Sequence, residues 1–124
     1  MASPNPLDSL TVLVADDDAD MRLYLRGCLL ALGAARVLDA ADGHEALRLA
    51  LTADLVVSDV VMPGMGGVAL CRALKADPRT CDLPVLLVSG EPAGPDTGAD
   101  GFLAKPFNAA GLRAEVERLL AHPL

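Results

Sequence analysis

Short apolar segments that alternate with helical patterns constrain this chain more than any other feature. Five such segments occur, at Leu10–Ala15, Arg36–Ala41, Leu55–Ser58, Val85–Val88 and Phe102–Ala104. The stretches between most of them have helical periodicity. The first, third and fourth segments are apolar at successive positions, as expected of strands that helices cover on both faces of a parallel sheet. The pattern therefore predicts a doubly wound α/β fold.

Caps and apolar stripes indicate where the helices lie. Leucines at 23, 25, 29, 30 and 32 give the first helix a broad apolar face, which ends at Gly33. Asp42 followed by Glu45 fits a capping box for the second helix, and Asn108 can cap the last one. Between Ser89 and Gly101, glycines and prolines interrupt the pattern, so we expect a loop or one short turn there.

Length, charge and cysteine content exclude several classes of protein. The 124 residues suit one domain, and 52% apolar residues allow a real core. The net charge of −7, without a basic stripe, argues against nucleic-acid binding. No segment approaches the roughly 20 apolar residues of a membrane span. The three cysteines form no C-x-x-C pair. We therefore expect a cytoplasmic protein with reduced thiols and no membrane partner.

Chemically active side chains follow four of the apolar segments. Asp16, Asp17 and Asp18 follow the first, Asp59 the third, Ser89 the fourth, and Lys105 with Pro106 the fifth. In an open parallel sheet, ligands bind beyond the carboxyl ends of the strands. Two carboxylates about 4 Å apart repel by roughly 4 kcal/mol near a protein surface, so such a cluster favours a cation, and Mg²⁺ suits carboxylates that also meet a phosphate. A carboxylate nucleophile, a metal, a lysine and a hydroxyl together indicate phosphoryl transfer to an aspartate.

Three motifs resemble the receiver domain of two-component response regulators. They are Val-Leu-Val-Ala-Asp-Asp-Asp at 12–18, Asp-Leu-Val-Val-Ser-Asp-Val-Val-Met-Pro-Gly-Met-Gly-Gly at 54–67, and Gly-Ala-Asp-Gly-Phe-Leu-Ala-Lys-Pro-Phe at 98–107. The resemblance spans about residues 9–121, after a tail at 1–8 that we expect to be disordered. It implies a stand-alone receiver with a flavodoxin-like sheet of five parallel strands in the order 2-1-3-4-5.

The resemblance also implies a metal site and a phosphoacceptor. Asp59 would accept the phosphoryl group. Asp16 and Asp17 would hold Mg²⁺ together with Asp59, with Asp17 as a direct ligand, and the backbone carbonyl of Val61 would complete the protein's share of the metal sphere. Lys105 would pair with a phosphoryl oxygen, and the Lys105–Pro106 bond is expected to be cis, as is common in the family.

Four further positions have implied or proposed roles in signalling. Ser89 occupies the hydroxyl position of the family pattern and would act both in catalysis and in the switch. Phe102 occupies the position of the switch aromatic. Val61, two residues after Asp59, and Glu91, two after Ser89, flank the expected path of water to the acyl phosphate. An apolar residue at 61 cannot orient that water and so favours a long-lived phosphoryl group, an effect that Glu91 could offset.

The implied partners follow from the implied chemistry. The phosphoryl group would come from a phosphohistidine on a sensor histidine kinase or a histidine phosphotransfer protein. The domain would catalyse its own phosphorylation and slow dephosphorylation without being a conventional multi-turnover enzyme. Output would pass to an unidentified downstream protein, with a homodimer as a further candidate assembly.

One departure from the family pattern keeps alternatives open. Ser89 and Lys105 are only 16 positions apart, so the family's fourth helix is expected to be shortened or absent. That helix belongs to the face that changes on activation, which leaves room for a pseudo-receiver that binds partners without phosphorylation. A haloacid-dehalogenase-like phosphatase is a second alternative, with Asp16 as nucleophile and Asp18 as the acid–base residue. The acids at 16–18 could also simply cap a helix.

Overall fold

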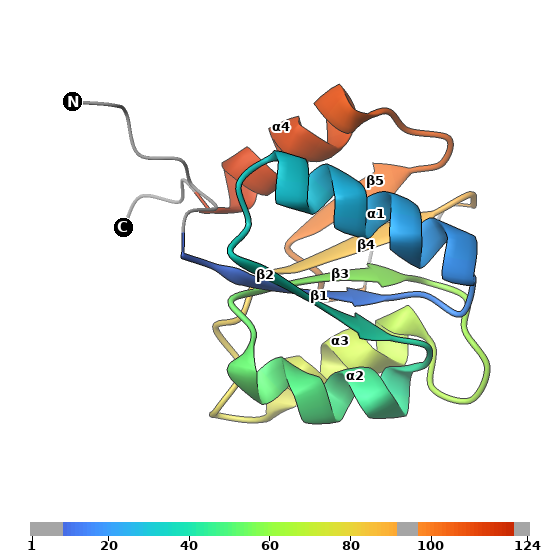
Figure 1. The fold of residues 1–124 in the computed structure, drawn as a ribbon. Coiled ribbons are helices and arrows are strands. Elements are labelled where there is room, and N and C mark those ends of the chain that lie inside the picture. The colour runs from blue at the N-terminus through green and yellow to red at the C-terminus, as the bar shows by residue number, and fades with distance from the viewer. Residues whose placement is uncertain (1–8, 92–96, 121–124) are drawn as a thin grey trace.

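Five parallel strands form a sheet in the order β2-β1-β3-β4-β5 in the part of the chain that the structure describes, residues 9–91 and 97–120 of a computed structural model (Figure 1). The strands are β1 (Thr11–Ala15), β2 (Arg36–Ala40), β3 (Leu55–Asp59), β4 (Val85–Ser89) and β5 (Gly101–Ala104). The helices are α1 (Ala19–Ala31), α2 (Gly43–Leu49), the 3-10 turn η1 (Ala50–Thr52), α3 (Gly67–Ala76) and α4 (Ala109–Leu120). Fold class, strand order and strand positions agree with the prediction.

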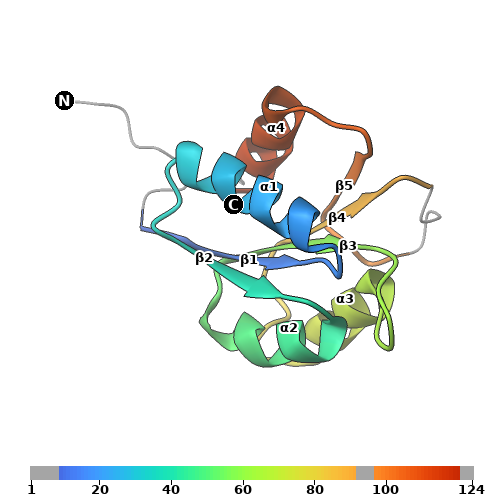
Figure 2. The ribbon, with the colours of Figure 1, turned by 45° about the vertical axis from the view of Figure 1, so that its right-hand side comes forward.

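The helices cover the sheet in two layers. Helices α1 and α4 lie on one face, and α2 and α3 lie on the other (Figures 1 and 2). Each face has its own buried cluster. Successive side chains of β1, such as Val12 and Leu13, point to opposite faces and belong to different clusters. Burial on both faces explains why the central strands are apolar at successive positions. In the described residues, no helix is long and apolar enough to cross a membrane.

The predicted caps are present. Asp42 precedes α2, and its carboxylate accepts a hydrogen bond from the Glu45 backbone N–H at 2.8 Å. The Glu45 carboxylate in turn accepts from the Ala41 N–H at 2.8 Å, one residue before the position of an ideal capping box. Asn108 accepts from the Gly111 N–H at 2.8 Å and so caps α4. These caps set where two of the helices begin against the sheet.

The apolar face of α1 is narrower than the leucine pattern predicts. Leu25 and Leu29 are buried against the sheet, but Leu23 is 68% exposed and Leu30 is 43% exposed. The two exposed leucines are seven residues apart, which brings them to the same side of an α-helix, opposite Leu25. The broad inward face is therefore a correction to the prediction: α1 has apolar side chains on both sides, and only one side faces the core.

The connection between β4 and β5 contains no helix in its described residues, 90–91 and 97–100. This agrees with the shortened or absent fourth helix, although residues 92–96 lie outside the described part of the chain. The expected tail at 1–8 also lies outside it. The four described α-helices leave one face of β5 without a helix over it, and Phe102 on that strand is 40% exposed.

Candidate functional site

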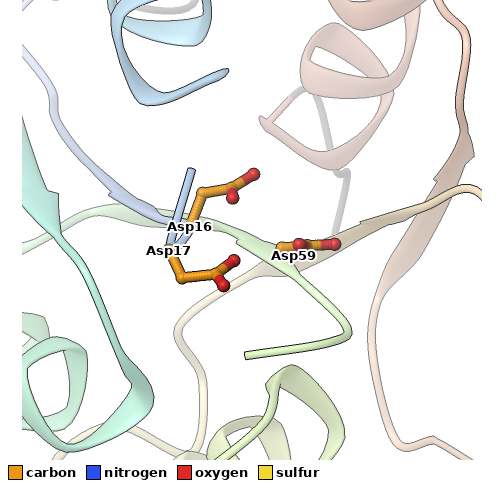
Figure 3. Close-up of side chains that lie close together, drawn as sticks. All are labelled: Asp16, Asp17 and Asp59. Carbon is orange, nitrogen blue, oxygen red and sulfur yellow. The ribbon is translucent and has the colours of Figure 1, made fainter. Parts of the chain in front are cut away.

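Three carboxylates meet at the carboxyl ends of β1 and β3. Asp16 and Asp17 follow β1, and Asp59 is the last residue of β3; the pairing of Ala15 with Ser58 brings these two strand ends side by side. One oxygen from each carboxylate lies within 4.8 Å of the other two (Figure 3). The predicted convergence of Asp16, Asp17 and Asp59 is thus present in the structure.

The loop after β1 separates Asp18 from this cluster. The Asp16 backbone N–H donates to the Ala40 carbonyl at 3.0 Å, and the Asp18 N–H donates to Asp16 Oδ1 at 2.9 Å. Asp18 itself caps α1, because its Oδ1 accepts from the Asp20 N–H at 2.9 Å. The helix-cap interpretation therefore holds for Asp18, whereas Asp16 and Asp17 belong to the carboxylate cluster.

Asp16 is a buried acid without full pairing. The residue is 1% exposed, and its Oδ2 has no hydrogen-bond partner among the described residues. Burial raises the pKa of Asp16 above its ordinary value, and the charges of Asp59 and Asp17 raise it further. The Asp18 N–H and the charge of Lys105 act in the opposite direction. A buried carboxylate oxygen that faces two more carboxylates is a suitable ligand for a hard divalent cation.

Lys105 supplies positive charge at the cluster. Its Nζ lies 3.5 Å from Asp59 Oδ1 and 3.7 Å from Asp16 Oδ2. The residue directly follows β5, and its backbone N–H donates to the Ser89 carbonyl at 2.8 Å, which fixes it beside the end of β4. The Lys105–Pro106 peptide is cis, in agreement with the prediction. The ammonium group therefore bridges the two strand ends that carry the acids.

The other predicted residues lie around this cluster. Ser89 ends β4, is 4% exposed, and accepts a hydrogen bond from the Glu91 N–H at its Oγ, 3.1 Å away. Phe102 pairs with Leu87 in the sheet, so its side chain shares a face of the sheet with Ser89. Val61 is 69% exposed beyond the end of β3. The roles predicted for these residues remain proposals.

Sequence reasoning did not identify two features of the rim. Arg22 of α1 donates from Nη1 to the Asp16 carbonyl at 2.6 Å. An apolar cavity of about 320 Å³ opens beside the cluster, between α1 and the residues that follow β5, and is lined by Met21, Tyr24, Lys105, Pro106 and Phe107. The sequence carries no clear signal for either feature. An arginine in the first turns of a helix is usually solvent-exposed, and a cavity depends on how the helix and the loop pack.

Comparison with known proteins identifies the family of this chain. A sequence model of the response regulator receiver domain matches residues 12–117, which include all the site residues above. The chain belongs to this family. As a receiver domain it is a module of two-component signalling, and this assignment removes the support for the haloacid-dehalogenase-like alternative.

Individual relatives agree with the assignment. The receiver domain is 35% identical over 118 residues to a chemotaxis protein CheY of Pseudomonas aeruginosa, an alignment that covers 89% of this chain and 95% of that protein. It is 35% identical to the receiver domain of a signal transduction histidine kinase from Syntrophus aciditrophicus, with a TM-score of 0.83 and 91% of each chain covered. A response regulator structure from Chloroflexus aurantiacus gives a TM-score of 0.85 at 32% identity, covering 93% of this chain and all of the other, 100%.

Proposed function

We propose that Asp59 is the phosphoacceptor of this receiver domain, and that the phosphoryl group comes from a phosphohistidine on a sensor histidine kinase or a histidine phosphotransfer protein. The observation that supports the proposal best is the position of Asp59: it shares a cluster with two other carboxylates and lies 3.5 Å from the Lys105 ammonium. This combination suits an attack on phosphorus. The positive charge of Lys105 can offset the negative charge of the carboxylates and that of the transferred phosphoryl group.

The transfer requires one carboxylate oxygen to attack and one to stay fixed. Asp59 Oδ1 accepts a hydrogen bond from the Val60 N–H at 2.9 Å and faces Lys105. Both contacts, among the described residues, engage Oδ1. Oδ2 would therefore be the oxygen that forms the new O–P bond. The P–N bond to the donor imidazole breaks as this bond forms, and the imidazole leaves as the neutral base by retaining or gaining one proton. The product is an acyl phosphate on Asp59.

The acidic cluster could hold a metal ion, for which we propose Mg²⁺. Its ligands would be Asp16, Asp17, Asp59 and the backbone carbonyl of Val61. The buried Oδ2 of Asp16 fits this assignment: it accepts no hydrogen bond from the described residues, and the Lys105 ammonium lies 3.7 Å away, so the oxygen can accept a further cation. When bound, such an ion supplies positive charge against the phosphoryl oxygens.

Lys105 and Ser89 would bind the transferred group. The Lys105 ammonium, already beside Asp59 Oδ1, is placed to pair with a phosphoryl oxygen. Ser89 Oγ accepts the Glu91 N–H, so its own hydroxyl hydrogen stays free to donate. A hydrogen bond from Ser89 to the phosphoryl group would pull this end of β4 toward Asp59. Phe102, on the same face of the sheet, would then move inward and change the surface presented to a downstream protein.

The test is phosphorylation by a small donor. Wild type, Asp59→Asn and Asp16→Asn are incubated with Mg²⁺ and acetyl phosphate, and intact mass is recorded; Asp39→Asn, an exposed acid on β2, is the matched control. We expect wild type and Asp39→Asn to gain one phosphoryl group, Asp59→Asn none, and Asp16→Asn less than wild type. No gain by wild type would refute the proposal and favour the pseudo-receiver. Donor turnover that survives Asp59→Asn but is lost in Asp16→Asn would instead point to Asp16 as the nucleophile.

A further inference from the structure

Two arginines of α1 reach back from the helix to backbone carbonyls of the sheet. Arg22 Nη1 donates to the Asp16 carbonyl at 2.6 Å, at the end of β1. One turn later, Arg26 Nη1 donates to the carbonyl of Val37, the second residue of β2, at 3.0 Å, and also lies 3.4 Å from Asp39 Oδ2. The two contacts are alike in chemistry, but only the contact of Arg22 falls on the loop that carries the clustered acids.

The peptide bond after Asp16 connects two acids of the cluster. Because a peptide group is planar, its carbonyl oxygen, the Asp17 N–H and the Cα atoms of both residues lie in one plane. A donor that holds the Asp16 carbonyl therefore restrains the rotation ψ of Asp16 and the rotation φ of Asp17, and with them the directions in which both side chains leave the backbone. The hydrogen bond of Arg22 thus acts on Asp16 and Asp17 together, although it touches neither carboxylate.

Among the contacts of the described residues, the other hydrogen bonds of this loop act on the neighbouring peptides. The Asp16 N–H bond to Ala40 holds the peptide before Asp16, and the Asp18 N–H bond to Asp16 Oδ1 ties the Asp16 carboxylate to the peptide after Asp17. Asp17 is exposed at the surface of the loop. Arg22 holds the peptide before Asp17, and the Asp18 N–H bond holds the peptide after it.

We propose that Arg22 is a positioning residue that fixes the Asp16–Asp17 peptide and so prearranges two of the metal-binding carboxylates. The proposal rests on the proposed function of the cluster as a Mg²⁺ site. A guanidinium is charged at every accessible pH and makes a stronger hydrogen bond to a carbonyl than a neutral donor. Residues that orient metal ligands without touching the metal commonly change metal affinity by about 10- to 100-fold when they are replaced.

The experiment compares Arg22→Gln and Arg22→Lys with Arg26→Gln, the matched arginine-to-carbonyl contact on the same helix. Mg²⁺ binding to each purified chain is measured by titration calorimetry. We expect Arg22→Gln to bind Mg²⁺ about tenfold more weakly than wild type. Arg22→Lys should recover part of that loss, and Arg26→Gln should bind like wild type. Thermal melting in the absence of metal checks that all variants are folded.

Two further measurements separate positioning from general destabilisation. With acetyl phosphate as donor, Arg22→Gln should need more Mg²⁺ for half-maximal phosphorylation, while its rate at saturating Mg²⁺ stays close to wild type. In metal-free protein, NMR should show faster hydrogen exchange at the Asp18 amide in Arg22→Gln and not in Arg26→Gln.

The outcomes distinguish this proposal from the one it rests on. Wild type that fails to bind Mg²⁺ would overturn the proposed metal site and the role of Arg22 together. Wild type that binds Mg²⁺, with Arg22→Gln binding equally well, would overturn the role of Arg22 alone. Equal losses in Arg22→Gln and Arg26→Gln would also overturn it, because the effect would then belong to the stability of α1.

Discussion

At the scale of single residues, the buried carboxylate of Asp16 lowers the stability of the folded chain. The carboxyl is buried, its Oδ2 accepts no hydrogen bond from the described residues, and its pKa is raised by burial and by its acidic neighbours. The native state therefore binds this proton more tightly than the unfolded chain. The free energy of unfolding then falls as pH rises from the unfolded pKa to the native one, and above that interval the full cost remains.

Asparagine at position 16 should relieve this cost. Asp16→Asn keeps an oxygen that can accept the Asp18 N–H and removes the charge that faces Asp59 and Asp17. We predict that metal-free Asp16→Asn melts at a higher temperature than metal-free wild type at pH 7, and that the gap narrows toward pH 4. Thermal unfolding with a chelator present is the measurement, and the exposed Asp39→Asn is the control. A lower melting temperature than wild type at pH 7 would contradict the prediction.

Val61 provides the second prediction at this scale. It is 69% exposed two residues after Asp59, where its side chain has no group that can orient a water molecule toward an acyl phosphate. Val61→Asn supplies an amide that can do so. We predict that phosphorylated Val61→Asn loses its phosphoryl group several-fold faster than wild type, as followed by intact mass after removal of the donor.

The effect at position 61 should be chemical rather than steric. Val61→Leu, which has the branched shape of asparagine but no polar group, is the matched control and should stay closer to wild type than Val61→Asn does. If Val61→Asn retains its phosphoryl group for as long as wild type, control of lifetime lies elsewhere, and Glu91, two residues after Ser89, becomes the next residue to vary.

At the scale of the helices, α1 and α2 contain glycines in opposite environments. A Cβ added to Gly27, in the middle of α1, would meet nothing within 4 Å. A Cβ added to Gly43, at the start of α2, would overlap the Met65 carbonyl and would lie 2.7 Å from the Met65 side chain. The first glycine therefore costs helix stability without a packing reason, and the second is required by close contact with the loop before α3.

Alanine should separate the two cases. We predict that Gly27→Ala raises the free energy of unfolding by about 0.5–1 kcal/mol, since alanine loses less backbone entropy in a helix. Gly43→Ala should lower it, because the Met65 backbone must move to admit the methyl group. Urea unfolding of both variants beside wild type is the measurement. A loss of stability in Gly27→Ala would show that this position has a constraint that the packing does not reveal.

The helices also show which parts of the fold the sequence can predict. Local signals predict most of it: the capping interaction of Asp42 with Glu45 and the cap at Asn108 lie where the pattern places them. The leucines of α1 did not predict the buried face correctly, because apolar positions all around a helix do not indicate which side packs against the sheet. Leu23 and Leu30 are exposed for this reason.

The site was predictable for a different reason. Parallel strands bring their carboxyl ends to one edge of the sheet, so the meeting of Asp16, Asp17, Asp59 and Lys105 follows from topology once the strands are placed. The burial of Asp16 and the contact of Arg22 with its carbonyl depend on side-chain packing and helix orientation. Neither leaves a periodic signal in the sequence.

At the scale of the whole molecule, the two faces of the sheet are covered unequally. The apolar clusters extend under α1 and α4 on one face and under α2 and α3 on the other, but the second cluster includes no residue of β5. In the described residues no helix covers that face of β5, and Phe102 is 40% exposed there. A ring that is partly exposed beside a buried site has room to move inward without displacing a packed helix.

A tryptophan at position 102 should report this movement directly. The chain contains no tryptophan, so Phe102→Trp creates a single tryptophan at the end of the sheet that carries Ser89 and Lys105. We predict that phosphorylation with acetyl phosphate and Mg²⁺ shifts its emission to shorter wavelength, because the indole leaves water as Ser89 is drawn toward the phosphoryl group. The same change should be absent when Asp59→Asn is added. Leu51→Trp, which labels the 50% exposed residue of η1, should not respond. Full phosphorylation by mass without a spectral change at position 102 would mean that the signal leaves the molecule by a surface other than β5.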